Sequence, residues 1–256
     1  MGEPGMSKTF SELVAEGAAE PVEGWDFSWF SGRATEERPP WGYARLMAAR
    51  MAQAGAALDI QTGGGEVLAS IPKVPPVLAA TESWPPNAAL ARERLRPLGG
   101  TVAEVADTAD LPFPGESFDL VVSRHPADVL WPEIARVLRP GGTYLSQQVG
   151  AGSNRELYEY MMGPQRDDQS RSAAVAAAGA EAAGLTVTRL EEKALRVQFL
   201  DIGAVVYFLR KVLWTVPGFT VEKYAARLEA LHEEITAAGA FTCHSRRFLI
   251  EARKPA

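Results

Sequence analysis

A run of glycines directly after a short apolar segment is the first feature of this chain that could hold a ligand. Residues 56–60 have the composition of a buried parallel strand, the glycines 63–65 follow, and Glu66 can begin a helix. A strand, a tight glycine turn and a helix N-terminus together bring backbone N–H groups close to a ligand. Glycine suits such a turn because a Cβ would block both the turn and the ligand's approach. A lone glycine run also occurs in ordinary turns, so the residues that follow decide between a ligand-binding turn and an ordinary one.

Acidic residues follow the next two predicted strands. Residues 77–81 are predicted to form a strand that ends at Glu82, and residues 102–106 a weaker strand that Asp107 follows. A carboxylate roughly 20 residues beyond the glycine turn is where an α/β nucleotide-binding fold places its acceptor for the ribose hydroxyls. The spacing therefore predicts a nucleotide-like ligand at this edge of a sheet.

The fourth predicted strand comprises residues 117–123, and a histidine lies just beyond it. Ligands of open α/β sheets bind outside the carboxyl ends of the strands, so His125 lies where a reacting substrate is expected. A neutral imidazole there could take a proton from an attacking hydroxyl or amine, with an ionisation near the usual value of about 6.5. The same histidine could instead hydrogen-bond the loop and orient the substrate without moving protons.

This series of motifs resembles the class I S-adenosylmethionine-dependent methyltransferases over about residues 58–148. Any one of the motifs is a weak signal, but five in order at suitable spacing are specific. One departure is Gln61, which stands where the family usually has the first glycine of the loop. The matching segments are Asp59 with Gly63 and Gly65 (the glycine loop), Glu82 (the ribose ligand), Asp107-Thr108 with Leu111-Pro112-Phe113 (the adenine-binding motif), SFDLVVS at 117–123 and RVLRPGGTYL at 136–145.

The resemblance implies a fold and a domain organisation. The fold is α/β: a doubly wound, mostly parallel seven-stranded sheet of the Rossmann-like methyltransferase type, with N-terminal and late-chain helical lid elements. Residues 1–40 would form an N-terminal helix and an aromatic flap. Residues 41–256 would form the methyltransferase domain, with a lid insertion at about residues 199–240.

The resemblance also implies a cofactor, S-adenosylmethionine, with S-adenosylhomocysteine as its product. Asp59 is expected to order the glycine loop more than to contact the cofactor, and Trp84 could lie against the adenine face. The candidate cofactor-binding residues are Asp59, Thr62, Gly63, Gly64, Gly65, Glu82, Ser83, Trp84, Asp107, Thr108 and Arg124.

The substrate side of the site is predicted from aromatic residues. The segment 25–33 is unusually aromatic for a non-periodic stretch, and it is either a plug at one end of the core or a flap over the methyl donor. An apolar face around Tyr207 could line an acceptor pocket or make a dimer contact. The candidate substrate-binding residues are Trp25, Phe27, His125, Gln148, Tyr158 and Tyr207, with His125 as the candidate catalytic residue.

Composition limits the partners. The 256 residues carry a net charge of −6, which argues against a nucleic-acid substrate because phosphates need a basic surface. Cys243 is the single cysteine, so disulfides and cysteine zinc sites are excluded. No run approaches the roughly 18 apolar residues of a membrane helix. We therefore expect a cytoplasmic protein, monomeric or homodimeric, that has a small-molecule substrate and no metal, nucleic-acid or membrane partner.

The resemblance thus implies methyl transfer from S-adenosylmethionine to an oxygen or nitrogen of a small-molecule acceptor, as in secondary metabolism, by in-line displacement. Two alternative functions stay open at this stage. One is a methyltransferase that acts on a macromolecule (protein, tRNA or rRNA), which would require a basic or extended groove. The other is a non-catalytic protein that binds S-adenosylmethionine without transferring its methyl group.

Overall fold

The computed structural model describes residues 8–22 and 27–256. None of the helices among these residues is long and apolar enough to cross a membrane. The helices are α1 (Phe10–Ala19), α2 (Tyr43–Met51), α3 (Glu66–Ala69), α4 (Pro85–Leu95), α5 (Trp131–Val137), α6 (Arg155–Met162), α7 (Ala173–Ala182), α8 (Ile202–Lys211) and α9 (Ala225–Ala238), with 3-10 helices at Ser28–Phe30 and Arg96–Leu98. The strands are β1 (Ala34–Glu36), β2 (Ala56–Ile60), β3 (Val77–Glu82), β4 (Thr101–Glu104), β5 (Phe118–Arg124), β6 (Leu138–Val149), β7 (Thr186–Phe199) and β8 (Phe241–Arg253).

The chain forms two compact units. The sheet unit comprises residues 38–151, 168–193 and 246–256, and the helical unit comprises the described residues up to 37 together with 152–167 and 194–245. The chain therefore passes from one unit to the other several times, and β7 and β8 contribute residues to both. Every candidate residue of the nucleotide-like site, from Asp59 to Arg124, belongs to the sheet unit.

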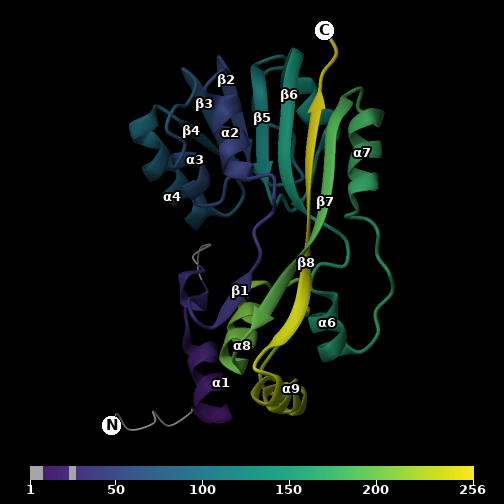
Figure 1. Ribbon diagram of the computed structural model, residues 1–256. Coiled ribbons are helices and arrows are strands. Elements are labelled where there is room, and N and C mark those ends of the chain that lie inside the picture. Colours follow the sequence, from purple (N-terminus) through teal and green to yellow (C-terminus); the bar gives the residue numbers. More distant parts are fainter. Residues whose placement is uncertain (1–7, 23–26) are drawn as a thin grey trace. The chain divides into compact units, whose positions relative to one another are not determined.

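The sheet has eight strands in the order β1-β7-β8-β6-β5-β2-β3-β4 (Figure 1). The pairs β2–β3, β2–β5, β3–β4 and β5–β6 are parallel, whereas β6–β8 and β1–β7 are antiparallel. The α/β fold of the methyltransferase type is confirmed, but the expected number of seven strands is wrong and the sheet is mixed. The additional strand, β1, has only three residues, which are too few for a periodic pattern to predict a strand.

Strand residues alternate between two apolar layers in the sheet unit. Leu58 and Val121 belong to the layer with α5 and α7, whereas their neighbours Ala57 and Val122 belong to the layer with α2, α3 and α4 (Figure 1). Successive strand residues point to opposite faces, so a fully buried strand is apolar on both. This explains why β2 is buried at every position. The two helical layers hold the carboxyl ends of β2, β3 and β5 side by side.

Polar side chains cap the N-termini of α1 and α8. Thr9 caps α1 in a capping box with Glu12: its hydroxyl accepts from the Glu12 N–H at 3.3 Å, and the Glu12 carboxylate accepts from the Thr9 N–H at 2.7 Å. Asp201 caps α8 by accepting from the Ala204 N–H at 2.9 Å. The N-terminal helix expected within residues 1–40 is α1, and α8 is helical structure within the insertion expected at about residues 199–240.

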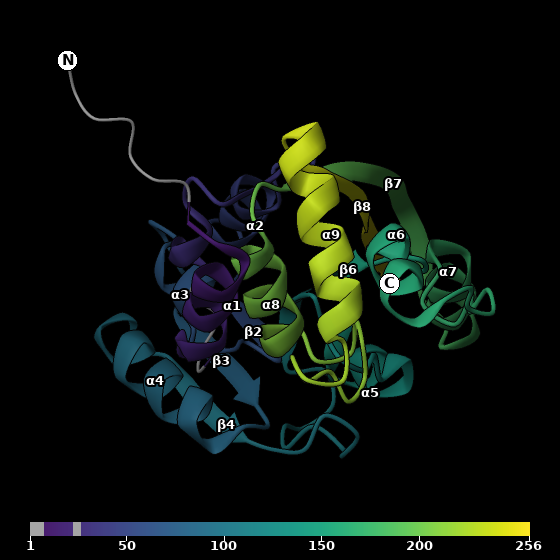
Figure 2. The same cartoon turned by 90° about the horizontal axis from the view of Figure 1, so that it is seen from below.

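The core of the helical unit is built around α8. Nearly all of α8 is buried, and it packs against α1 and α9 (Figure 2). The α1–α8 crossing is close because glycines face each other, and a Cβ added at Gly17 would lie only 2.2 Å from the Gly203 carbonyl oxygen. The two backbones could not keep this separation with any larger residue.

The Gly17→Ala variant tests this crossing. Helix propensity alone would stabilise the variant by roughly 0.5–1 kcal/mol, but the clash with the Gly203 backbone should lower the free energy of unfolding by about 1–3 kcal/mol instead. Urea denaturation followed by circular dichroism measures the difference. An increase in stability would show that α1 does not lie against α8 in this way.

Candidate functional site

The glycine turn after β2 uses left-handed backbone at three positions. Gln61, Gly63 and Gly65 have φ of 56°, 65° and 79°, and Gly65 is the N-cap of α3. A Cβ at Gly65 would lie 3.3 Å from the Cα of Ala91 on α4, so glycine is required there for packing as well as for conformation. The turn therefore joins a strand to a helix N-terminus, as the sequence pattern predicts, with glutamine where the family usually has the first glycine.

Glu82 ties this turn to the end of β3. Its side chain is 7% exposed, and its carboxylate accepts the Gly63 N–H at 2.8 Å and the Trp84 N–H at 3.0 Å. A carboxylate oxygen has two lone-pair sites, so each oxygen can accept one further donor. The predicted ribose ligand is thus also a structural part of the glycine turn.

Asp59 lies beneath the turn at the end of β2. It is 6% exposed, and its carboxylate accepts from the Thr62 hydroxyl at 2.7 Å. Burial raises the pKa of Asp59 from 3.8 to about 7; the Thr62 hydrogen bond opposes this shift and the charge of Glu82 adds to it. The contact with Thr62 agrees with the expectation that Asp59 orders the loop.

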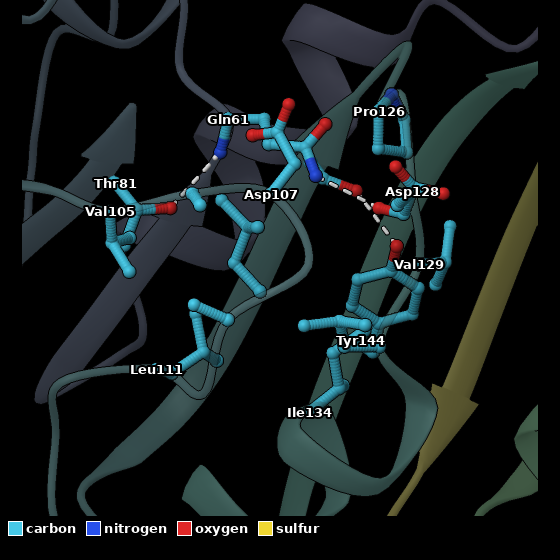
Figure 3. A pocket seen from close by; sticks show the side chains of 15 residues that line it. Gln61, Thr81, Val105, Asp107, Leu111, Pro126, Asp128, Val129, Ile134 and Tyr144 are labelled. Carbon is cyan, nitrogen blue, oxygen red and sulfur yellow. Dashed lines mark hydrogen bonds between the residues drawn. The ribbon is translucent and has the colours of Figure 1, made fainter. Parts of the chain in front are cut away.

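A small cavity of about 20 Å³ lies beside these residues. Its volume is enough for about one water molecule. Asp107 lies at its edge, half-buried, and burial raises the pKa of this carboxyl group while a hydrogen bond from Ser83 lowers it. The remaining walls are mainly apolar and include Ile60, Val105, Leu111, Leu130 and Ile134 (Figure 3).

Gln61 joins the glycine turn to the segment after β5. Its side-chain carbonyl accepts the Ala127 N–H at 2.5 Å, and its amide nitrogen donates to the Asp128 carbonyl at 2.9 Å (Figure 3). Glutamine in place of the family's glycine therefore connects the glycine turn to the segment after β5 by two hydrogen bonds. Sequence analysis missed this role because residues so far apart in the chain give no local signal.

His125 follows β5 in a left-handed conformation, with φ of 55°. Its backbone N–H donates to the Gln147 carbonyl at 2.7 Å, and its Nε2 lies 2.9 Å from the Gln147 amide nitrogen. Burial and the charges of Arg247, Arg124 and Arg171 hold the pKa of His125 well below its usual value. The expected ionisation near 6.5 is therefore corrected downwards, because desolvation and neighbouring cations both disfavour the imidazolium.

The substrate-side residues divide between the two units. Gln148 is buried in the sheet unit and donates to the Tyr144 hydroxyl at 3.5 Å. Phe27, Tyr158 and Tyr207 lie in the helical unit, and Trp25 falls outside the described residues. Their contact with a substrate stays a prediction.

The described part of the aromatic segment packs within the helical unit. The ring of Trp29 lies 4.9 Å from that of Tyr207, and the ring of Phe30 lies 5.1 Å from it. The Arg33 guanidinium lies 3.9 Å over the Trp29 ring and forms an ion pair with Asp201. These contacts favour a core-packing role for Trp29 and Phe30, whereas Phe27 is 41% exposed.

Several other predicted cofactor residues are exposed. Thr108, Trp84 and Arg124 are exposed, and Trp84 is the N-cap of α4. A Cβ at Gly64 would meet the side chains of Glu66 and Arg94, so this glycine leaves room for their ion pair. Among residues 8–22 and 27–256, no group of three or more His, Cys, Asp or Glu side chains is arranged to hold a metal ion.

Known proteins share this domain and fold. A family model described as a methyltransferase domain matches residues 58–146. A solved structure of a candidate methyltransferase from Bacillus halodurans C-125 aligns with a TM-score of 0.59 at 20% identity, over 84% of this chain and 100% of that one. The YcgJ protein of Bacillus subtilis aligns with a TM-score of 0.60 at 17% identity, over 84% and 98% of the two chains. The cyclase SpnF aligns with a TM-score of 0.51 at 18% identity, over 96% and 93%.

These comparisons confirm the resemblance on which the sequence analysis relied. The matched range, 58–146, contains the glycine turn, Glu82, Asp107 and His125. At such low identities the solved structures show the fold alone. No curated protein sequence matches the chain significantly.

The raised pKa of Asp59 predicts a pH dependence of stability. Between pH values of about 4 and 7 the folded state keeps this proton and the unfolded state loses it, so the free energy of unfolding should fall as pH rises through this window. Asp59→Asn should remove roughly 2–4 kcal/mol of that decline. Urea denaturation at pH 5, 6, 7 and 8 measures it, with the exposed Asp110→Asn as the matched control. An unchanged decline in Asp59→Asn would contradict the assignment.

Proposed function

We propose that this protein transfers the methyl group of S-adenosylmethionine to a small-molecule acceptor, because residues 58–146 match a family model described as a methyltransferase domain and solved methyltransferase structures share the fold. The observation that carries the proposal is the buried Glu82 carboxylate, held at the mouth of the glycine turn with acceptor capacity to spare. The acceptor atom would be an oxygen or a nitrogen.

The chemistry of the site fits this cofactor. Glu82 would accept the ribose hydroxyls, and Asp107 would accept the adenine amino group beside the apolar wall of Leu111. Carboxylates on this side also suit a ligand that carries a positive sulfonium. The enclosed space of about 20 Å³ is much smaller than the cofactor, so the proposal requires most of the cofactor to lie along the open strand ends.

The residues act by alignment rather than by covalent chemistry. The bound cofactor supplies an electrophilic methyl carbon, which an acceptor lone pair displaces in line from a neutral sulfur leaving group. Glu82 and the glycine turn would fix the ribose and the methyl donor in one orientation. His125, at the end of the adjacent strand β5, would orient the acceptor. Its engaged Nε2 and lowered pKa make it a weak general base at neutral pH.

A small-molecule acceptor is favoured over a nucleic acid by charge. The net charge of −6 gives little attraction to a polyanion such as tRNA. A second candidate function is cofactor binding without methyl transfer. SpnF, described as a cyclase, shares the fold, so the fold is not confined to proteins described as methyltransferases. Both candidates need the same cofactor site and differ only in turnover.

Calorimetry with S-adenosylhomocysteine tests the cofactor site. Glu82→Gln should weaken binding by about tenfold to a hundredfold, because a charged acceptor for the ribose hydroxyls becomes a neutral one. Glu104→Gln is the matched control, since Glu104 pairs with Glu82 in the β3–β4 register but is exposed. No binding to the wild-type protein, or equal affinities of the two variants, would contradict the proposal.

Methyl transfer is tested with S-adenosylmethionine labelled in its methyl group. Fractions of small metabolites, tRNA and protein are offered separately, and we expect the label to enter the small-molecule fraction. Label in tRNA or protein would identify a macromolecule methyltransferase. Tight cofactor binding with no transfer to any fraction would identify the non-catalytic alternative.

A further inference from the structure

The carboxyl edge of the sheet unit is divided by charge. Along the strand order, the acidic side chains Asp107, Glu82 and Asp59 follow or end β4, β3 and β2. Beyond β2 arginines are added: Arg124 ends β5, and Arg247 on β8 lies opposite Val149 at the end of β6. Asp128, in the segment after β5, is an acidic residue on this side. The two halves meet between β2 and β5, next to each other in the sheet.

A hydrogen-bond relay determines which nitrogen of His125 carries the proton. The Trp41 indole N–H is a donor only, and it donates to the Gln147 side-chain carbonyl at 2.7 Å. The Gln147 amide group must therefore turn its NH₂ towards His125, where it donates to Nε2 at 2.9 Å. His125 Nε2 is then an acceptor without a proton, and the neutral ring carries its proton on Nδ1.

The relay is rigid because it is buried. Trp41 is 4% exposed and Gln147 is 4% exposed, so neither can exchange its partner for water. Among the described residues, His125 Nδ1 donates to none, and it is thus a free donor. The low pKa of His125 is consistent with this geometry, because an imidazolium would direct an N–H at the Gln147 NH₂ group.

Two arginines lie in or next to the segment that contains the His125 donor. Arg171 donates to the Pro126 carbonyl at 2.8 Å and to the Ala127 carbonyl at 3.0 Å, which places its guanidinium against the segment that follows His125. Arg124 is exposed, and its positive charge favours the ionised form of the buried Asp59 carboxyl group.

We propose that the basic cluster, defined as Arg124, His125, Arg171 and Arg247, binds an anionic group of the acceptor, a carboxylate or a phosphate. His125 donates its Nδ1–H to one oxygen of that group, and the guanidinium groups supply the opposite charge. The cationic cofactor then lies over the acidic half of the edge and the anionic acceptor over the basic half. The inference that the bound anion belongs to the methyl acceptor rests on the proposed function, whereas the inference that an anion binds here does not.

Nitrogen-15 NMR of the His125 ring tests the relay. In the wild-type protein at pH 7 we expect the proton on Nδ1 and an unprotonated Nε2. Gln147→Glu should reverse this, because a carboxylate can only accept and would draw the proton to Nε2 while its other oxygen keeps the Trp41 bond. A wild-type ring protonated on Nε2, or on both nitrogens, would overturn the proposal.

Titration with inorganic phosphate and with acetate tests the anion site, in the presence of S-adenosylhomocysteine and at constant ionic strength set with sodium chloride. We expect saturable binding of at least one ion, followed by the His125 resonances, and the tighter ion identifies the chemistry. Arg124→Gln and Arg247→Gln should each weaken it by about tenfold. Arg92→Gln, an exposed arginine on α4 beside the acidic half, is the matched control and should change nothing.

The outcomes separate the two proposals. A linear response to both ions, or the same affinity in Arg124→Gln as in Arg92→Gln, would overturn the anion site. S-adenosylhomocysteine binding is measured in the same samples. Its failure, with saturable anion binding intact, would contradict the proposed function and leave the anion site standing.

Discussion

The candidate site depends on one buried carboxylate that accepts hydrogen bonds from two backbone N–H groups. Glu82 joins the glycine turn after β2 to the first turn of α4 through Gly63 and Trp84. A buried charge is costly unless it is hydrogen-bonded, and these contacts provide the compensation. Because the carboxylate holds the left-handed turn in place, the position of the backbone N–H groups and the position of the charged acceptor are set together.

Asp59 shows the cost of that arrangement. Two carboxylates lie near each other beneath one turn, and burial raises the pKa of Asp59 to about 7. The Thr62 hydroxyl, through a short hydrogen bond, and the charge of Arg124 offset part of this desolvation. A site that holds such a poorly solvated carboxyl group is prepared for a cationic ligand, because a positive charge nearby would favour the ionised form.

The segment after β5 is held by side chains from two directions. Gln61 holds Ala127 and Asp128 from one direction, and Gln147 holds His125 from the other. The segment is therefore anchored to both neighbouring strands, β2 and β6, on either side of β5. Such double anchoring suits a group that must orient an acceptor against a fixed methyl donor, because small displacements are costly in an aligned displacement.

The amino-acid sequence alone determined the parts of this protein that depend on local patterns. The glycine turn, the acidic residues after β3 and β4, and the capped helices α1 and α8 all follow from neighbouring residues, so periodicity and spacing were enough to place them. The tertiary structure alone decided β1, the great length of β7 and β8, and the contacts of Gln61. The polar stretch of β7 between Glu191 and Arg196 has no continuous apolar alternation to announce a strand.

The role of His125 was likewise a matter for the tertiary structure. Its place beyond β5 could be predicted, but its protonation depends on Gln147, 22 residues away, and on Trp41, which lies 106 residues from Gln147. Sheet order brings these residues together, and no local pattern encodes it. The protonated nitrogen of His125 can be assigned only when the donors and acceptors around its ring are known. These partners are brought together by the sheet, so the sequence alone could not give the assignment.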